Sequence, residues 1–157
     1  MSATARLEPP GEAGGGSLYE RDFYSWAMQQ AALLRARRLD ELDVENVAEE
    51  IESLGRSEAK ELRSSYRVLL MHLLKWRYQP KHRSRSWAAT IVRERQNAQL
   101  GVQENPGLNS LQAELFAEAY RLARKEAAVE TGLPLTTFPE TCPHSLEQAL
   151  DEEFWPD

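Results

Sequence analysis

The longest helix pattern in the chain is DVENVAEEIESLGRSEAKELRSSYRVLLMHLLKWRYQP, residues 43–80. Asp43 suits the N-cap, because its carboxylate can accept a hydrogen bond from the first turn. Pro80 ends the segment, since proline lacks an N–H and keeps the preceding residue out of helical geometry. Apolar residues recur at the helical period and predict one buried face: Val47, Ile51, Leu54, Leu62, Tyr66, Leu69 and Leu73, flanked by Ala48, Ala59 and Leu70.

Two residues interrupt this face. Gly55 weakens a helix by about 1 kcal/mol relative to alanine. Glu58 falls at the centre of the apolar stripe, where an unpaired buried carboxylate would be costly. Any bend is therefore expected at residues 55–57, and the pattern leaves open whether 43–80 forms one helix or two.

A first helix is predicted before this segment, from Leu18 to about Arg38, with Asp22 as its cap or first-turn acid. Its apolar face carries Tyr19, Phe23, Trp26, Ala27, Leu33 and Leu34. The connection over 39–42 is short, so this helix and the long one are expected to lie side by side and antiparallel.

Three more helices are predicted after Pro80. The first is capped by Ser84 or Ser86 and buries Trp87, Ile91, Ala98 and Val102. The second starts at a capping box of Asn109 and Gln112, ends at Gly132, and buries Leu108, Leu111, Leu115, Ala119, Leu122 and Val129. The proline-rich stretch LPLTTFPETCP is expected to run extended, and Ser145 with Gln148 starts a short last helix.

The predicted fold is therefore all-α, a bundle of four principal helices with a long central helix and a short C-terminal fifth helix. Residues 1–17 are rich in proline and glycine and predict a disordered N-terminal tail. Residues 18–157 are expected to form a single helical domain, because a chain of 157 residues is long enough for one core.

Composition limits the classes of protein to which the chain can belong. A formal net charge of −6 favours a soluble protein over one drawn to nucleic acid or membrane by overall charge. No apolar run approaches the roughly 20 residues of a membrane span, and the N-terminus lacks the apolar core of a secretory signal. Cys142 is the single cysteine, so no intrachain disulfide can form, which fits a cytoplasmic location.

Several motifs together resemble a bacterial family, the domain-of-unknown-function family numbered twenty-nine. They are LDVENVAEEIESLG, HLLKWRYQP, RSRSW, NPGL, EAAVETGL and FPETCPHSLEQALDEEF, and the similarity runs from about Tyr19 to Pro156. The resemblance implies an all-helical bacterial protein. The family has no assigned activity, so it supplies no catalytic residues.

The charge changes sign along the central segment. Seven acids and two bases lie between Asp43 and Glu61, whereas seven bases and one acid, Glu94, lie between Lys75 and Arg95. Basic and aromatic residues together are typical of surfaces that bind single-stranded nucleic acid. The sequence therefore predicts a binding module for nucleic acid or an acidic protein partner, built from Lys75, Trp76, Arg77, Arg83, Arg85 and Trp87. The other interpretation is internal, with the arginines paired to a neighbouring acidic helix face and the tryptophans anchoring the bundle.

An enzyme is the alternative function, with a pocket that holds Glu49, Glu52 and His72, joined by Trp76 and Arg85. His72 could act as a general base if a residue from another helix oriented it. A metal site is not predicted, because the chain has no Glu-x-x-His motif and its three histidines lack zinc-site spacing. No cofactor is predicted either.

Overall fold

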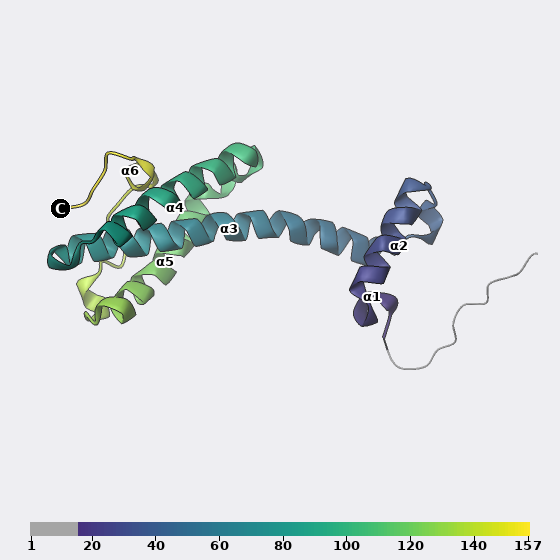
Figure 1. Cartoon of the computed structure of the whole chain (residues 1–157), viewed down its shortest axis with the longest axis horizontal. Coiled ribbons are helices and arrows are strands. Elements are labelled where there is room, and N and C mark those ends of the chain that lie inside the picture. Colours follow the sequence, from purple (N-terminus) through teal and green to yellow (C-terminus); the bar gives the residue numbers. More distant parts are fainter. Residues whose placement is uncertain (1–15) are drawn as a thin grey trace, which may run out of the picture. The chain divides into compact units, whose positions relative to one another are not determined.

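The computed structural model describes residues 16–157, and most of the predicted disordered tail, residues 1–15, lies outside this range. The described part is helical and contains no strand, so the predicted all-α fold with a long central helix is confirmed (Figure 1). Its helices are α1 (Leu18–Arg21), α2 (Phe23–Arg35), α3 (Val44–Tyr78), α4 (Arg85–Glu104), α5 (Gln112–Thr131) and α6 (Leu146–Leu150). Short 3-10 turns connect them: η1 (Leu39–Glu41), η2 (Pro80–His82), η3 (Pro106–Leu111) and η4 (Leu135–Thr137).

The chain divides into two compact units, Met1–Glu52 and Ser53–Asp157. We refer to the described part of the first, residues 16–52, as the N-terminal unit, and to the second as the C-terminal unit. α3 begins in one and ends in the other, and it continues as one helix through Gly55. The single domain expected over 18–157 stays a prediction. Among residues 16–157, every helix is too short or too polar to cross a membrane.

In the N-terminal unit, α2 is held against the start of α3 by polar side chains. The Asp43 carboxylate accepts hydrogen bonds from the Asn46 backbone N–H at 3.4 Å and from the Trp26 indole N–H at 3.0 Å. Gln30 accepts from the Asp43 backbone N–H at 2.8 Å. From α1, the Tyr19 hydroxyl donates to Glu50. Asp43 is confirmed as the cap of α3. The predicted antiparallel packing is wrong, because Trp26 and Gln30 in the middle of α2 both meet Asp43, and α2 crosses the start of α3 steeply (Figure 1). The Asn46 side-chain amide also donates to the Asp43 carboxylate, at 2.8 Å, and this bond contributes most to lowering the pKa of Asp43, ahead of the bond from Trp26.

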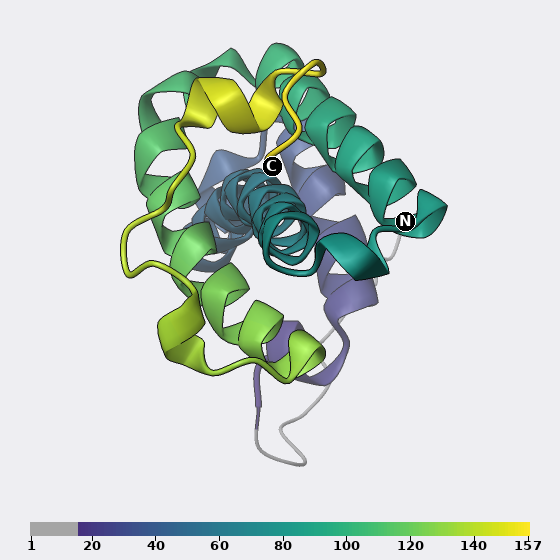
Figure 2. The same cartoon turned by 90° about the vertical axis from the view of Figure 1, so that its left-hand side faces the viewer.

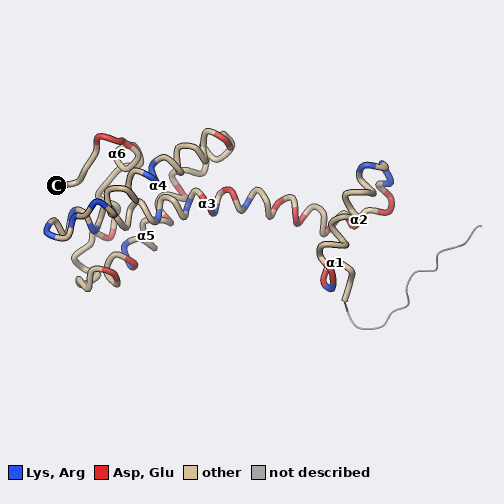
Figure 3. The backbone as a smooth tube through the Cα atoms, in the orientation of Figure 1, with Lys and Arg blue, Asp and Glu red and all other residues tan. Residues whose placement is uncertain are grey.

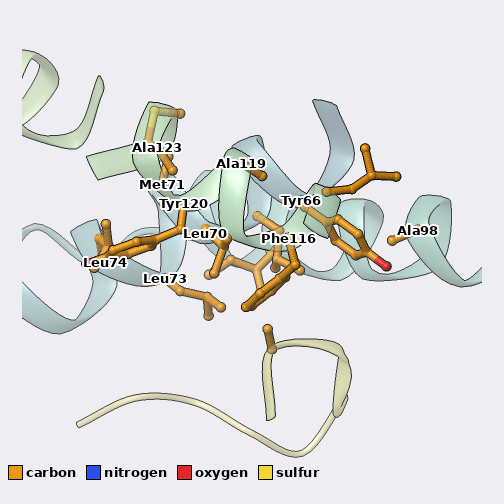
Figure 4. Packing of buried hydrophobic residues seen from close by; sticks show 14 of the residues in the cluster. Tyr66, Leu70, Met71, Leu73, Leu74, Ala98, Phe116, Ala119, Tyr120 and Ala123 are labelled. Carbon is orange, nitrogen blue, oxygen red and sulfur yellow. The ribbon is translucent and has the colours of Figure 1, made fainter. Parts of the chain in front are cut away.

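The hydrophobic core lies in the C-terminal unit, around the second half of α3. Figure 2, which looks along α3, shows α4, α5 and α6 arranged around that half. The α3 residues buried there are Leu62, Tyr66, Leu69, Leu70, Met71, Leu73 and Leu74. Figure 4 shows how they meet α5, where the Phe116 ring packs edge-on against Tyr66 at 5.5 Å between centroids.

Hydrogen bonds fix the direction of the flanking helices. Glu58 near the middle of α3 accepts from Asn105 at the end of α4, so α4 runs antiparallel to α3. The Tyr66 hydroxyl donates to Gln112 at the start of α5, and Gln79 donates to the Thr131 carbonyl at its end, so α5 runs parallel to α3. Glu58 is exposed and hydrogen-bonded, which removes the cost expected for a buried carboxylate at this position.

The first half of the predicted α3 stripe is not buried, contrary to the prediction. Ile51 and Leu54 are exposed, as is Ala48, and Val47 is half-buried. The physical reason is that α2 meets Asp43 through Trp26 and α1 meets Glu50 through Tyr19, and both acids lie on a neighbouring face of the helix. The predicted helix is therefore confirmed over this stretch, whereas the predicted burial of its apolar residues is wrong here.

The start and the buried face of α5 also differ from the prediction. A 3-10 turn, η3, precedes the helix, and the Gln112 amide donates to the Asn109 side chain instead of forming a capping box. The predicted residues Leu111, Leu122 and Val129 are exposed, whereas α5 buries Leu115, Phe116, Ala119, Tyr120, Ala123 and Ala127. Small alanine side chains allow close packing, so Phe116, Tyr120 and the alanines face the core together with Leu115, while Leu122 and Val129 do not.

The predicted start of α4, end of α5 and start of α6 are confirmed. The predicted first helix differs, because it is interrupted at Asp22, which caps α2, and it ends at Arg35. Ser84 caps α4 by accepting from the Trp87 backbone N–H, and Gly132 ends α5 in the left-handed conformation at a φ of 71°. Ser145 and Gln148 form the capping box of α6. The proline-rich stretch before α6 contains one 3-10 turn, η4, within an otherwise irregular path.

Replacing one core leucine tests which residues hold the C-terminal unit together. Leu73→Ala should lower the free energy of unfolding by about 2–5 kcal/mol, because a fully buried leucine leaves a cavity. Leu122→Ala, the same change at a partly exposed site on α5, should cost about 1 kcal/mol or less. Urea denaturation followed by circular dichroism measures both, and equal losses would contradict the observed α5 face.

Candidate binding surface at the turn between α3 and α4

Basic residues gather where α3 ends and α4 begins, as the blue segments of the backbone in Figure 3 show. No acidic residue occurs between Trp76 and Arg93. Within this run Arg77, Lys81, His82, Arg83 and Arg85 are exposed. Arg83 also donates internal hydrogen bonds, and we call the other four residues the basic tip. The turn thus presents positive charge to solvent on an otherwise acidic chain.

The helix ends explain part of this arrangement. Lys75 and Arg77 lie in the last turn of α3, where cations interact favourably with the negative end of the helix dipole. Arg85 lies in the first turn of α4, where a cation is unfavourable and where no acid is present. Arg85 therefore adds its charge to the positive end of α4 at some cost to the helix. That placement favours an anion at the turn.

A small cavity of about 310 Å³ opens beside the basic tip. Tyr78, Pro80 and Leu133 give it an apolar wall, and Gln79, Lys81 and His82 complete its lining. Such a site combines room for an apolar side chain with cations at its edge.

The other predicted binding residues of this segment have internal partners. Lys75 is buried, donates to Glu130 at 2.5 Å and lies 4.5 Å from the centre of the Trp87 ring. Arg83 donates to the Trp76 carbonyl at 2.9 Å and to the Pro156 carbonyl, and its guanidinium lies over the Trp76 ring. Lys75, Trp76, Arg83 and Trp87 therefore stabilise the bundle.

Trp76 and Tyr78 also pack against the C-terminal part of the chain. Trp76 contacts Trp155 with 4.8 Å between ring centroids, and Tyr78 contacts Phe138 edge-on at 5.2 Å. The internal interpretation of the aromatic residues is thus the one that these contacts favour.

Three basic residues of α3 pair with acids of α5. Three ion pairs link the two helices: Arg63 with Glu118, Arg67 with Glu126, and Lys75 with Glu130. The members recur at helical spacings on both helices, which was the sequence signal for this ladder. Because most of these side chains are partly exposed, each pair contributes no more than about 1 kcal/mol.

Arg95, which the sequence places in the basic segment, is buried, with 1% of its surface exposed. Its guanidinium donates to the carbonyls of Ala149 at 2.8 Å, Glu152 at 3.4 Å and Phe154 at 2.5 Å. Burial lowers the pKa of Arg95, while the charges of Asp151 and Glu152 act in the opposite direction. Arg95 therefore fastens the C-terminal segment to α4 and takes no part in the exposed surface. It shares a helical face with Ile91 and Ala98, which was the signal for its burial.

His144 is a buried histidine near the basic tip. Its Nε2 atom has no hydrogen-bond partner, and its ring packs edge-on against Phe154 at 5.2 Å. Burial, with a further contribution from the positive charge of Arg77, lowers the pKa of His144 to about 4. Burial also raises the pKa of the Cys142 thiol, so this cysteine is not activated as a nucleophile.

The residues of the alternative enzyme pocket belong to different parts of the chain. Glu49 and Glu52 lie in the N-terminal unit, whereas His72 lies in the C-terminal unit. His72 is half-buried, its Nδ1 lies 2.8 Å from the Val68 carbonyl oxygen, and burial lowers its pKa. A cavity of about 470 Å³ in the C-terminal unit is lined by Glu58, Glu61 and Glu104 but by none of the predicted pocket residues. Within residues 16–157, no cluster of His, Cys, Asp and Glu could hold a metal ion.

Fold and surface together define an all-α protein with an exposed basic turn. The chain belongs to the family described as Domain of unknown function DUF29, whose model matches residues 18–155. This match confirms the resemblance drawn from the sequence motifs. Neither the curated proteins nor the solved structures contain a match to the chain.

Replacing Arg95 tests how the C-terminal segment is held. Arg95→Lys keeps the charge but cannot reach three carbonyls, so the free energy of unfolding should fall by about 2–4 kcal/mol. Arg93→Lys on the exposed side of α4 should cost less than about 1 kcal/mol. Urea denaturation at neutral pH compares the two variants. Similar midpoints would show that the carbonyl contacts contribute little.

Acid should destabilise the fold through His144. Its pKa is about 4 in the folded chain, against an ordinary value of 6.5, so the unfolded chain binds the extra proton between these values. Stability is therefore complete above about pH 6.5 and is lost as pH falls toward 4, by up to about 3 kcal/mol.

Other groups also titrate between pH 4 and 6.5 and change the unfolding free energy, so a variant is needed to isolate the contribution of His144. His144→Gln removes this proton, so the difference in unfolding free energy between wild type and variant should change with pH over this range. Urea denaturation at a series of pH values measures it. A difference that stays constant with pH would contradict the assignment to His144.

Proposed function

We propose that this chain is a binding module that takes an acidic protein segment on the basic tip. One observation carries the proposal. The run from Trp76 to Arg93 contains no acid and spans the end of α3, the turn η2 and the start of α4. It exposes Arg77, Lys81 and Arg85 beside the positive end of α4. Cations at the start of a helix cost stability, which favours a role in binding an anionic group.

The state of the aromatic side chains favours protein over single-stranded nucleic acid. Bases are recognised by stacking on open aromatic faces. Here Trp76 is packed against Trp155 and Arg83, and Tyr78 against Phe138. The ring of Trp87 is contacted by Lys75. The net charge of −6 also repels a polyanion that would spread over a large surface.

The cavity beside the tip supports a partner that is both acidic and apolar. An apolar side chain of the partner would enter the space between Tyr78, Pro80 and Leu133. Neighbouring carboxylates would then pair with Lys81 and Arg85. Because each exposed ion pair contributes about 1 kcal/mol or less, binding depends on several pairs together and weakens with salt.

The place of action is part of the same proposal. We infer a bacterial cytoplasmic protein from the family resemblance and from the single cysteine, Cys142. An acidic protein is the partner that such a location and surface would allow.

A titration with defined probes tests the proposed function. A fluorescent peptide of alternating glutamate and leucine should bind the wild-type chain at low salt, and its affinity should fall steeply as salt rises. The triple variant Arg77→Gln, Lys81→Gln and Arg85→Gln should bind about tenfold more weakly or worse, because the attractive charge is removed. Fluorescence anisotropy gives the dissociation constants.

A matched variant separates the basic tip from net charge. Lys60→Gln, Arg121→Gln and Lys125→Gln change the charge equally at exposed sites elsewhere and should leave the affinity unchanged. A single-stranded oligonucleotide serves as second probe. If it bound more tightly than the peptide and depended on the tip, nucleic acid would replace protein as partner. Absence of binding to either probe would refute the proposal.

A further inference from the structure

A cavity of about 470 Å³ opens between α3 and α4, at the end of α4 that is remote from the basic tip. Its lining residues recur at helical spacing on the two facing helices. They include Glu58, Glu61 and Leu62 on α3, and Asn97, Gly101 and Glu104 on α4. The cavity lies wholly within the C-terminal unit, and its volume is in the range that small-molecule sites occupy.

Three carboxylates line the cavity, and none of its lining residues is basic. The Asn105 side-chain amide donates to Glu58 at 3.1 Å, so Glu58 and Glu104 lie at the same end of the cavity. Within residues 16–157, the Glu61 and Glu104 carboxylates have neither a hydrogen bond nor an ion pair. Because Glu58 and Glu61 are three residues apart on one helix, their charges repel each other. This end of the cavity therefore favours a cation.

The position of Glu104 adds to the negative charge. Glu104 is the last residue of α4, where the negative end of the helix dipole favours a cation over a carboxylate. The last turn of α4 contains no basic residue that would compensate this charge. Glu104 therefore destabilises the helix end, and a cation bound in the cavity would offset that effect.

Gly101 leaves space in the α4 wall of the cavity. It lies inside a helix, where glycine is less stable than alanine. A Cβ atom built on Gly101 would meet nothing within 4 Å, so no packing contact requires glycine here, and the helical backbone does not require it either. The space beside this residue is therefore open to a ligand that lies against the backbone.

The mixture of lining groups indicates an organic cation instead of a metal ion. Within the described residues, no group of His, Cys, Asp and Glu could hold a metal ion. Leu62 and Leu100 give the cavity an apolar part, whereas metal ions such as Mg²⁺ keep water and oxygen ligands around them. A methylene chain packs on leucine, and its ammonium groups donate to carboxylates and to hydroxyls such as those of Ser64 and Ser65.

We propose that this cavity binds a linear aliphatic polyamine. One ammonium group lies among the carboxylates of Glu58, Glu61 and Glu104, and the methylene chain crosses Leu62. From Glu58 to Ser65 the α3 wall is about 10 Å long at 1.5 Å per residue, so an extended chain fits along it and places a second ammonium group near Ser65. The site shares no residue with the basic tip and does not depend on the proposed function.

Filling the cavity tests the site. Spermidine, a linear triamine, should bind the wild-type chain one to one at low salt. Gly101→Leu should weaken this binding at least tenfold, because the new side chain occupies the cavity, while the free energy of unfolding should not fall, because leucine favours a helix. Gly55→Leu changes a helix glycine with equally open surroundings that does not line the cavity, and it should retain the affinity. Isothermal titration calorimetry and urea denaturation measure the two effects.

Removing the unpaired carboxylates tests the role of charge. Glu61→Gln with Glu104→Gln should weaken spermidine binding about tenfold or more. Glu140→Gln with Glu153→Gln makes the same change in net charge at exposed sites outside the cavity and should leave the affinity unchanged.

Two results would overturn the proposal. The first is a wild-type chain that does not bind spermidine, or that binds it no more tightly than Gly101→Leu does. The second comes from a titration with MgCl₂ under the same conditions. If Mg²⁺ bound as tightly as spermidine and depended equally on Glu61 and Glu104, the cavity would be a metal site and not a polyamine site.

Discussion

The second half of α3 is apolar around nearly its whole circumference, and this constraint determines the rest of the C-terminal unit. Leu69, Leu70, Met71, Leu73 and Leu74 are buried almost consecutively. A helix of this kind needs cover on every side. α4 and α5 supply two sides, and α6 with the segment after it closes a third, as Figure 2 shows. The order of elements after Pro80 follows from this need.

The sequence predicted the helices better than it predicted what they bury. Helical period, caps and proline breaks are local, and they correctly placed the ends of α3, α4 and α6. Burial depends on which elements meet. Val47, Ile51 and Leu54 have the same pattern as Leu69 and Leu73, yet no local signal says that α1 and α2 contact a neighbouring face of α3. On α5, spacing alone did not show that Phe116 and Tyr120 face the core while Leu122 and Val129 do not.

The candidate binding surface was likewise predicted only in part. The run of bases was visible in the sequence, and exposure of Arg77 and Arg85 agrees with the surface expected there. The partners of Lys75 and Arg83 could not be predicted, because Glu130 and Pro156 are distant along the chain. The number of basic residues alone does not distinguish an exposed cation that can bind a ligand from one that pairs with a group of the same chain. The difference lies in tertiary contacts, and these leave the basic tip with fewer residues than the sequence suggested.

The way in which Arg95 holds the C-terminal segment has a consequence for sequence variation. All of its acceptors are main-chain oxygens, at Ala149, Glu152 and Phe154. Side chains at Glu152 and Glu153 can therefore change among relatives without loss of these bonds. An inserted or deleted residue between 149 and 154 would instead move the oxygens out of register with the guanidinium. Length, more than amino-acid identity, should be the property that evolution preserves in this segment.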